Sequence, residues 1–218
     1  MTKPRIPETD HGIQGEFTVA MYDEMLRRLR DRGWMDTPGL IRSGITRGHA
    51  LEIGPGPGYL GLEWLKCTLG TTLTGLDISP DMVALARRNA EAYGLASRVE
   101  YRLGDGSRLP FDDDRFDAVF SNGSLHEWAD PRATFDEIWR VLKPGGRVFI
   151  SDLRRDMFAG LRWFMWLTVR PVGMRPGLVT SIQAAYTPED LDGLKQPTRL
   201  GQCRVAGNVV GVSLSGLK

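Results

Sequence analysis

Residues 51–58 read LEIGPGPG, a short apolar run that ends in glycines at alternate positions. The leucines that follow, Leu62 and Leu65, have helical spacing, so the glycines join a strand to a helix. Glycine lets the backbone turn sharply here and lets a ligand approach it within hydrogen-bond distance. Unpaired N–H groups in the first turn of the helix would stabilise a ligand carboxylate or phosphate. We therefore expect this loop to lie against a cofactor.

Short apolar runs alternate with helical patterns along residues 50–151, which is typical of repeated βαβ units. Three predicted helices begin with the same sequence pattern, a residue with a capping side-chain oxygen followed by proline at the first helical position. They are Ser79-Pro80, Asp130-Pro131 and Thr187-Pro188. The predicted strands cover residues 50–53, 73–77, 99–103, 118–121 and 147–151. The fold class is therefore α/β, a parallel sheet with helices on both faces.

The chain length of 218 residues favours one compact domain with additions over two domains. We divide it into an N-terminal helical cap (1–48), a cofactor-binding core (49–152) and a substrate-recognition insertion with C-terminal strands (153–218). In the cap, residues 17–32 predict an amphipathic helix that covers the mouth of the site. Residues 157–169 predict a buried or lid helix, too short to cross a membrane. The rest of residues 152–186 is expected to be irregular and to recognise the substrate.

The charges are nearly balanced, with 28 Lys and Arg against 27 Asp and Glu. A net charge of +1 supplies no field for nucleic acid or an anionic membrane, so neither is expected as a partner. The two cysteines, Cys67 and Cys203, lie far apart and outside any Cys/His cluster, so neither a disulfide framework nor a metal site is expected. The N-terminus lacks the apolar run of a signal peptide, which predicts a cytoplasmic protein.

Acidic residues at two further strand ends narrow the choice of cofactor. Asp77 ends the second predicted strand, 19 residues after Gly58, where its carboxylate can accept hydrogen bonds from both ribose hydroxyls. Asp105, between two glycines after the third strand, can accept from an exocyclic amine such as that of adenine. Both aspartates are also common turn residues. Because residues 56–61 match the GxGxxG dinucleotide pattern, a nicotinamide cofactor stays open at this point.

Four segments in series resemble the motifs of class I S-adenosylmethionine-dependent methyltransferases. They are LEIGPGPGYLG at 51–61, LTGLDISPDM at 73–82, LGDGSRLPFDDDRFDAVFSNGSLHEW at 103–128 and IWRVLKPGGRVFISD at 138–152. The resemblance is to the small-molecule branch, which includes quinone-biosynthesis enzymes. It implies a Rossmann-like, mostly parallel seven-stranded sheet with helices on both faces and an antiparallel last strand. The runs at 203–207 and 209–214 would then form the closing hairpin.

The same resemblance implies that S-adenosylmethionine is the cofactor, and it assigns the site by position. Glu52 and the glycine loop would lie at the methionine end, Asp77 at the ribose, and Asp105 with Gly106 at the adenine. The segment after the fourth strand would lie beside the methyl group. The expected cofactor-binding residues are Tyr22, Glu52, Gly54, Pro55, Gly56, Gly58, Asp77, Ile78, Gly104, Asp105, Gly106, Asn122 and Gly123.

The expected reaction is methyl transfer by in-line displacement to a nucleophilic atom of a small, apolar or aromatic molecule. It needs positioning and exclusion of water, and it requires no metal. His126 is the candidate general base, which is needed only if the acceptor is protonated before the reaction. The alternative role for His126 is structural, as a hydrogen-bonding residue under the following loop.

Other functions and acceptors stay open from the sequence. The aromatic residues and arginines of residues 152–186 leave oxygen, nitrogen, sulfur and carbon acceptors possible. The alternatives are a methyltransferase for a peptide or protein, a nicotinamide-dependent oxidoreductase, and a cofactor-binding module without catalysis. Methylation of adenine in nucleic acid is disfavoured, because SNGS at 121–124 stands where such enzymes carry an Asp/Asn-Pro-Pro-aromatic motif.

Overall fold

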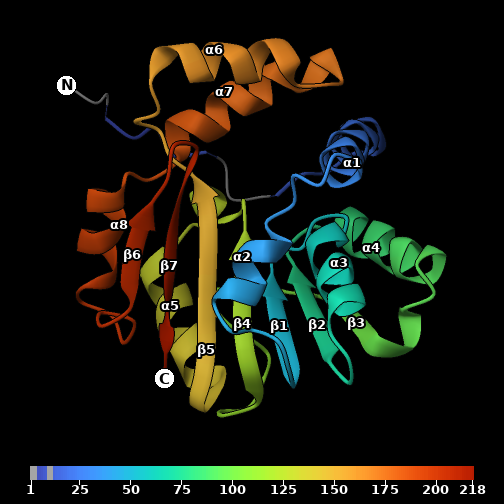
Figure 1. Cartoon of the computed structure of the whole chain (residues 1–218), viewed down its shortest axis with the longest axis vertical. Coiled ribbons are helices and arrows are strands. Elements are labelled where there is room, and N and C mark those ends of the chain that lie inside the picture. Colours follow the sequence, from blue (N-terminus) through green and yellow to red (C-terminus); the bar gives the residue numbers. More distant parts are fainter. Residues whose placement is uncertain (1–3, 9–11) are drawn as a thin grey trace.

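One seven-stranded sheet, in the order β3-β2-β1-β4-β5-β7-β6, forms the centre of the molecule (Figure 1). The computed structural model describes residues 4–8 and 12–218, so part of the predicted N-terminal cap (1–3 and 9–11) lies outside the described residues. Strands β1 to β5 pair in parallel, and β7 runs antiparallel to both of its neighbours. The predicted mostly parallel sheet and its closing hairpin are confirmed. The strands are β1 His49–Ile53, β2 Thr72–Asp77, β3 Val99–Leu103, β4 Phe116–Asn122, β5 Leu142–Leu153, β6 Arg204–Gly207 and β7 Gly211–Leu217.

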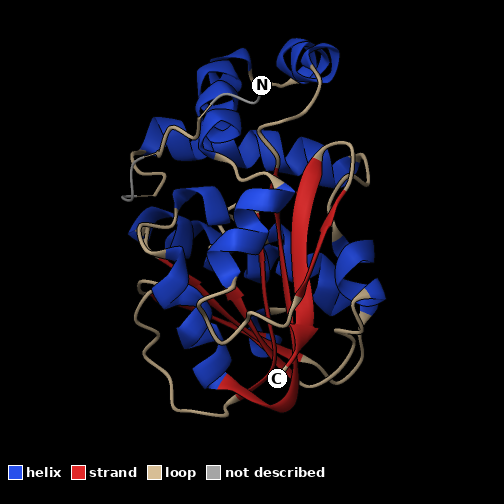
Figure 2. Ribbon diagram, turned by 90° about the vertical axis from the view of Figure 1, so that its left-hand side faces the viewer, coloured by secondary structure: helices blue, strands red, loops and turns tan. Residues whose placement is uncertain are grey.

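Helices cover both faces of the sheet, as predicted (Figure 2). Side chains alternate along β1: Leu51 packs in a cluster with residues of α5 and α8, whereas Ala50 packs with residues of α2 and α3. Burial of both faces is what makes these strands continuous apolar runs. The helices are α1 Glu16–Asp31, α2 Thr37–Arg42, α3 Tyr59–Cys67, α4 Pro80–Ala92, α5 Pro131–Val141, α6 Ala159–Thr168, α7 Arg175–Ala184 and α8 Pro188–Lys195, with short turns η1 Ala96–Arg98, η2 Leu125–Glu127 and η3 Val172–Met174.

The three predicted capped helices begin where the sequence places them. Ser79 accepts a hydrogen bond from the N–H of Met82, and Asp130 accepts two from the start of α5. Thr187 accepts from the N–H of Asp190 in a capping box. Local chemistry fixes these starts, because each cap and its donors lie within three residues of one another.

One strand begins earlier than predicted, and one helix was not predicted at all. Strand β5 begins at Leu142 instead of residue 147, because Leu142 pairs with Phe116 before the register shifts to the regular pairs. Helix α2 has no counterpart among the predicted elements. It is six residues long and contains proline and glycine, so it carries little helical signal of its own.

An upper layer of α1, α6 and α7 lies over the carboxyl ends of the parallel strands (Figure 1). The helix predicted over residues 157–169 is confirmed as α6. No α6 residue is buried, so of the two predicted alternatives, a buried helix and a lid helix, the structure has the lid helix. The expectation of an otherwise irregular segment up to residue 186 is wrong, because α7 forms there. Pro176 and Gly177 in the first turn of α7 weaken its helical pattern in the sequence, and Ile182 and Ala184 are buried by tertiary packing.

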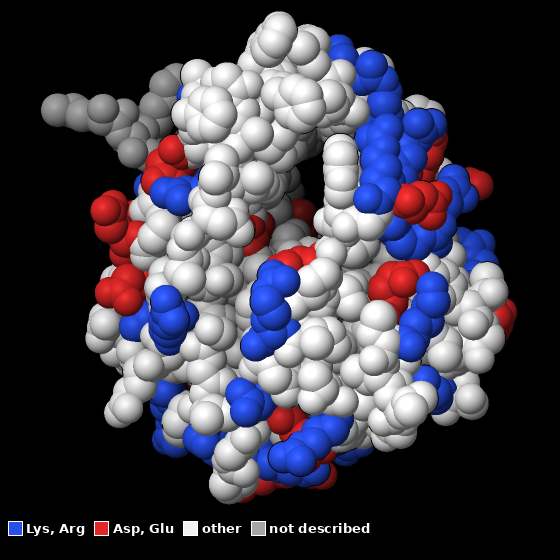
Figure 3. Space-filling view, viewed as in Figure 1, with Lys and Arg blue, Asp and Glu red and all other residues white. Residues whose placement is uncertain are grey.

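The face drawn in Figure 3 mixes basic and acidic side chains over the body of the molecule and over α1, and it is mostly uncharged over α6 and α7. Large apolar side chains exposed in the upper layer include Phe158, Trp163 and Phe164. A hollow opens below the layer, with acidic side chains visible inside it (Figure 3). Within residues 4–8 and 12–218, none of the helices combines the length and the apolar character needed to cross a membrane.

Candidate functional site

The glycine loop between β1 and α3 adopts a backbone that disfavours larger residues. Gly54, Gly56 and Gly58 have φ values of 65°, 52° and 82°, all in the left-handed region. A Cβ on Gly54 would lie 2.5 Å from Ser124 Oγ, and one on Gly58 would lie 2.4 Å from the hydroxyl of Tyr101. The loop therefore needs glycine both for its turn and for the close approach of its neighbours.

Asp77, at the end of β2, connects the glycine loop to the next turn. Its Oδ2 accepts a hydrogen bond of 2.9 Å from Gly56 N, and its Oδ1 accepts one of 2.9 Å from Ser79 N. Burial raises the pKa of Asp77, while these backbone donors act in the opposite direction. Asp77 thus has the turn-capping role of the alternative, and its ligand role stays a prediction, for which each carboxylate oxygen has further lone-pair capacity.

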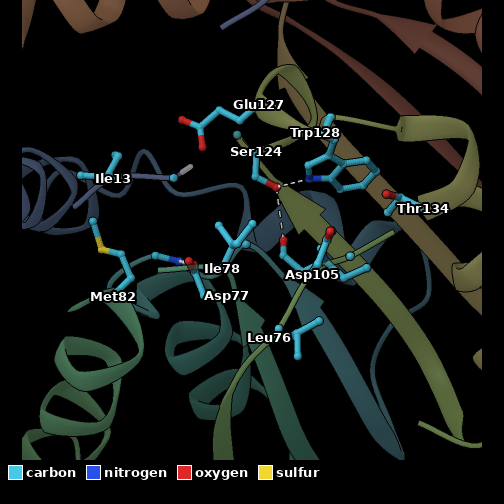
Figure 4. A pocket seen from close by; sticks show the side chains of 18 of the residues that line it. Ile13, Leu76, Asp77, Ile78, Met82, Asp105, Ser124, Glu127, Trp128 and Thr134 are labelled. Atoms are coloured by element: carbon cyan, nitrogen blue, oxygen red, sulfur yellow. Dashed lines mark hydrogen bonds between the residues drawn. The ribbon is translucent and has the colours of Figure 1, made fainter. Parts of the chain in front are cut away.

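Asp105 occupies the loop after β3 in a similar way. Its Oδ1 accepts from Ser107 N at 2.8 Å and its Oδ2 accepts from Ser107 Oγ at 2.8 Å. Its side chain lies among the residues that line a pocket next to Asp77, Ile78 and Leu76 (Figure 4). The two aspartates from neighbouring strand ends therefore meet at one cavity, as parallel strands require.

This smaller cavity has a volume of about 140 Å³. Its apolar walls include Ile13, Met82 and Trp128, and the indole N–H of Trp128 donates to Ser124 Oγ at 3.1 Å (Figure 4). Ile13 and Met82 were not predicted as site residues: Ile13 lies outside every motif, and Met82 ends the second motif segment but reaches the cavity from the first turn of α4. The expected residues that line the cavity are Tyr22, Gly54, Gly56, Asp77, Ile78, Gly104, Asp105, Gly106 and Gly123.

A larger cavity of about 1170 Å³ adjoins the smaller one and contains the other expected residues except Gly58. Glu52, Pro55, Asn122 and His126 line this larger cavity, whereas Gly58 lines neither and serves as the N-cap residue of α3. Residues Ile13, Tyr22, Gly54, Gly123 and Glu127 line both cavities. The two spaces therefore share a wall at the carboxyl ends of β1 and β4.

Glu52 lies under the glycine loop and not in the smaller cavity. Its side chain is buried, and its Oε2 has no hydrogen-bond partner among the described residues. Burial, together with the charge of Asp77, raises the pKa of Glu52 to about 8, although a backbone bond from Gly61 lowers it. A buried carboxyl with an unsatisfied oxygen is matched to a cationic or N–H donor of a ligand.

The larger cavity lies mostly between apolar surfaces of the upper layer and the sheet. Met25 and Leu29 of α1 face it from one side, and Leu161 and Met165 of α6 close it from above. Phe149 of β5 contributes to its floor. A space of this size and lining suits an apolar molecule larger than the ligand of the smaller cavity.

His126 is buried at the edge of the larger cavity, in the turn η2 after β4. Its Nδ1 lies 2.9 Å from Asp152 Oδ2, and its Nε2 lies 3.5 Å from Glu8 Oε2 and 3.8 Å from Glu127 Oε1. Burial lowers the pKa of His126, but the three carboxylates outweigh burial and raise it to about 9. The surroundings of His126 therefore favour the protonated, positively charged imidazole, whereas the general base suggested by the sequence would need the neutral imidazole.

The residues present fit S-adenosylmethionine. Glycines at 54 and 56 leave the loop open to close approach, and Asp77 and Asp105 supply acceptors at neighbouring strand ends. The unpaired buried oxygen of Glu52 provides an acceptor for an ammonium group below the loop. These are the acceptors that an amino-acid end, a ribose and an adenine need.

Comparison with known sequences agrees with this geometry. Residues 51–150 match a family model described as a methyltransferase domain. The chain is 32% identical to a demethylmenaquinone methyltransferase from Deinococcus radiodurans over 79% of this chain and 72% of that protein. It is 30% identical to a ubiquinone/menaquinone biosynthesis C-methyltransferase from Geotalea daltonii over 77% of this chain and 75% of that protein.

Comparison with solved structures gives the same fold. A structure from Methanococcus maripaludis, described as an S-adenosyl-L-methionine-dependent methyltransferase, superposes with a TM-score of 0.76. The match covers 93% of this chain and 94% of that one, at 22% sequence identity. At this identity the likeness concerns the fold.

Proposed function

The chain belongs to the class I S-adenosylmethionine-dependent methyltransferases, and we propose that its acceptor is a ring carbon of a reduced quinone with an apolar side chain. The observation that supports this proposal is that the two cavities are adjacent. A polar cofactor site and an apolar acceptor site therefore share a wall. The alternatives of a protein acceptor and of nicotinamide chemistry are not favoured. The relatives matched over most of their length carry the names of quinone methyltransferases.

The cofactor site is proposed to use the residues predicted for it. S-adenosylmethionine supplies a methyl group bonded to a positively charged sulfur. Asp77 would accept from the ribose hydroxyls, and Asp105 with the backbone of Gly106 would meet the adenine in the smaller cavity. Glu52 would lie at the amino-acid end, where a cationic group satisfies its buried oxygen. Tyr22 of α1 covers both cavities from above.

The larger cavity is proposed to hold the acceptor with its ring at the shared wall and its apolar side chain between α1 and α6. Transfer of an apolar side chain into this space is favourable by about 25 cal/mol for each Å² removed from water. The methyl group would pass to a ring carbon, the electron pair of the broken carbon–sulfur bond would stay on the sulfur, and the ring carbon would release its proton to bulk water after the transfer. The chain contributes positioning and exclusion of water at the reacting atoms.

Mixed surface charge and the small-molecule site favour a metabolite over nucleic acid as the acceptor. Two cysteines without a disulfide, exposed Cys67 and buried Cys203, fit a reducing compartment. We therefore propose that the protein is located in the cytoplasm, as the sequence predicts.

Methyl transfer from isotope-labelled S-adenosylmethionine tests the proposal. We expect labelled product with demethylmenaquinol carrying an isoprenoid side chain, and far less with catechol or with a mixed peptide substrate. Mass spectrometry of the product locates the label on ring carbon. Transfer to catechol or peptide without transfer to the quinol would contradict the proposed acceptor. Tight binding of NAD without binding of S-adenosylhomocysteine would contradict the cofactor assignment.

A further inference from the structure

Three potential ligand side chains from two distant parts of the sequence meet beside the larger cavity. Glu8 lies in the N-terminal segment, and His126 and Glu127 belong to the turn η2. One oxygen from each glutamate and one imidazole nitrogen lie within 4.8 Å of one another. Ligand atoms at about 2.1 Å from one metal ion lie about 3 to 4 Å apart, so a small rotation of a carboxylate suffices.

The imidazole nitrogen that faces the two glutamates lacks a hydrogen bond. His126 is 5% exposed, and its Nε2 has no hydrogen-bond partner among the described residues. The separations of 3.5 Å to Glu8 and 3.8 Å to Glu127 are longer than hydrogen bonds of this type. A buried polar atom without a partner is costly, and this one points at two carboxylates. A cation between the three groups would satisfy all of them.

The other nitrogen of the same ring is held by a buried carboxylate. Asp152 Oδ2 lies 2.9 Å from His126 Nδ1 and also accepts the backbone N–H of His126 at 2.8 Å. The Asp152 side chain is 1% exposed. Metal-binding histidines use such a carboxylate to fix the tautomer and the ring orientation, which leaves Nε2 as the free lone pair.

The N-terminal segment is attached so that Glu8 stays at this place. Ile6 N donates to Gln183 O of α7 at 3.1 Å, and Glu8 accepts hydrogen bonds from Thr180 and Ser181 of the same helix. Arg5 donates to the carbonyl of His126 at 2.9 Å. The carboxylates of Glu8 and Glu127 face Nε2 and that of Asp152 faces Nδ1, so negative charge is concentrated around this imidazole ring.

We propose that Glu8, His126 and Glu127 bind a divalent transition-metal cation, with Asp152 as the positioning residue behind the imidazole. One imidazole and two carboxylates match Zn²⁺, Mn²⁺ or Fe²⁺ better than the all-oxygen sets of Mg²⁺ and Ca²⁺. Three protein ligands leave coordination positions open. All three residues line the larger cavity, so an oxygen of the acceptor can occupy an open position. The site goes beyond the proposed function, and it departs from the sequence-based expectation of no metal.

Direct binding of Zn²⁺ and Mn²⁺ to the full chain, without donor or acceptor, tests the site independently of activity. Calorimetry with Zn²⁺ and electron paramagnetic resonance with Mn²⁺ are expected to show one equivalent bound. Glu8→Gln and His126→Gln should each weaken binding at least about ten-fold, and Asp152→Asn about ten- to a hundred-fold. Glu63→Gln is the matched control, since the Glu63 side chain is 22% exposed and that of Glu8 is 21% exposed. Its affinity should equal that of the unmodified chain.

Circular dichroism and binding of S-adenosylhomocysteine establish that each variant is folded. Should His126→Gln not fold, Glu8→Gln decides, because Glu8 is partly exposed and reaches the cluster from the other side. Co²⁺ adds a spectroscopic readout, since a visible absorption band that is lost in Glu8→Gln reports ligation at this cluster. The proposal is overturned if no metal binds, or if metal binds with equal affinity to Glu8→Gln and to the unmodified chain.

Discussion

Asp77 Oδ2 accepts a hydrogen bond of 2.9 Å from the backbone N–H of Gly56, so the end of β2 holds the glycine loop of β1 in place. The other carboxylate oxygen accepts from Ser79 N and fixes the start of α4. One side chain thus couples two loops that both border the smaller cavity. Its removal affects the shape of the site as well as any direct contact with a ligand.

For Asp77→Ala we expect the affinity for S-adenosylhomocysteine to fall about ten- to a hundred-fold or more. The reason is that a hydrogen bond to a charged acceptor contributes about 1.5 to 3 kcal/mol and that the loop also loses its attachment. Isothermal titration calorimetry measures the change. Asp112→Ala, in an exposed turn, serves as the control and should bind normally. Unchanged affinity in Asp77→Ala would place the ribose elsewhere.

For Gly54→Ala we expect a loss of stability larger than that of Gly70→Ala. Both glycines have a positive φ, 65° and 67°, so both alanines carry strain of about 1 to 2 kcal/mol. A Cβ on Gly54 also meets Ser124 Oγ at 2.5 Å, whereas one on Gly70 meets nothing within 4 Å. The clash adds about 1 to 3 kcal/mol. Urea unfolding measures both, and equal losses would contradict the close packing of the loop.

For Glu52→Gln we expect a gain in stability that depends on pH. The folded pKa of about 8 lies above the ordinary value of 4.5, so Glu52 favours the folded state fully below pH 4.5 and loses this contribution as the pH rises through 8. The variant should therefore gain on the order of a few kcal/mol above pH 8 and little below pH 4.5. Urea unfolding without cofactor, from pH 4 to pH 9, measures the difference.

We expect Glu137→Gln to change the stability with pH in the opposite direction to Glu52→Gln, so Glu137→Gln is the control for this series. A hydrogen bond from Arg140 lowers the pKa of Glu137, so its contribution is present at neutral pH and is lost as the pH falls through the folded pKa. The variant should lose stability at pH 7 and approach the unmodified chain in acid. A gain for Glu52→Gln that is independent of pH would show that its carboxyl is ionised normally.

For Leu161→Asp we expect the KM for an apolar acceptor to rise about ten-fold or more, with unchanged affinity for S-adenosylhomocysteine. Leu161 lines the larger cavity and not the smaller one, and loss of the contact between this leucine and the apolar side chain of the acceptor would cost about 1.5 to 3 kcal/mol. Trp163→Asp on the same helix is the control, because Trp163 is 62% exposed and lines neither cavity. Equal effects of the two variants would mean that the acceptor binds elsewhere.

The motifs that could be predicted from the sequence are those whose signal is local. The glycines at 54, 56 and 58, the aspartates at 77 and 105, and the proline-capped helix starts each depend on neighbours within a few residues. The order of these motifs along the chain then placed the strand ends at one edge, because parallel strands all end there.

The acidic cluster beside the larger cavity could not be predicted in this way. Glu8 reaches His126 only because Ile6 pairs with α7, and α7 itself shows no clear pattern in the sequence. From the sequence alone, a histidine in this motif is expected to act as a base near neutral pH. The structure surrounds the same ring with three carboxylates, which favour a positive charge there.

The sequence alone determined the sheet and the glycine loop, because backbone conformation, capping and apolar periodicity act over a few residues, and the resemblance of four motif segments indicated the family. Tertiary structure decided that Glu52 lies beneath the loop and not in the smaller cavity, that α6 and α7 cover the larger cavity, and that Glu8 meets His126. The physical reason is that burial and charge environment are set by residues distant in the chain, which no local pattern encodes.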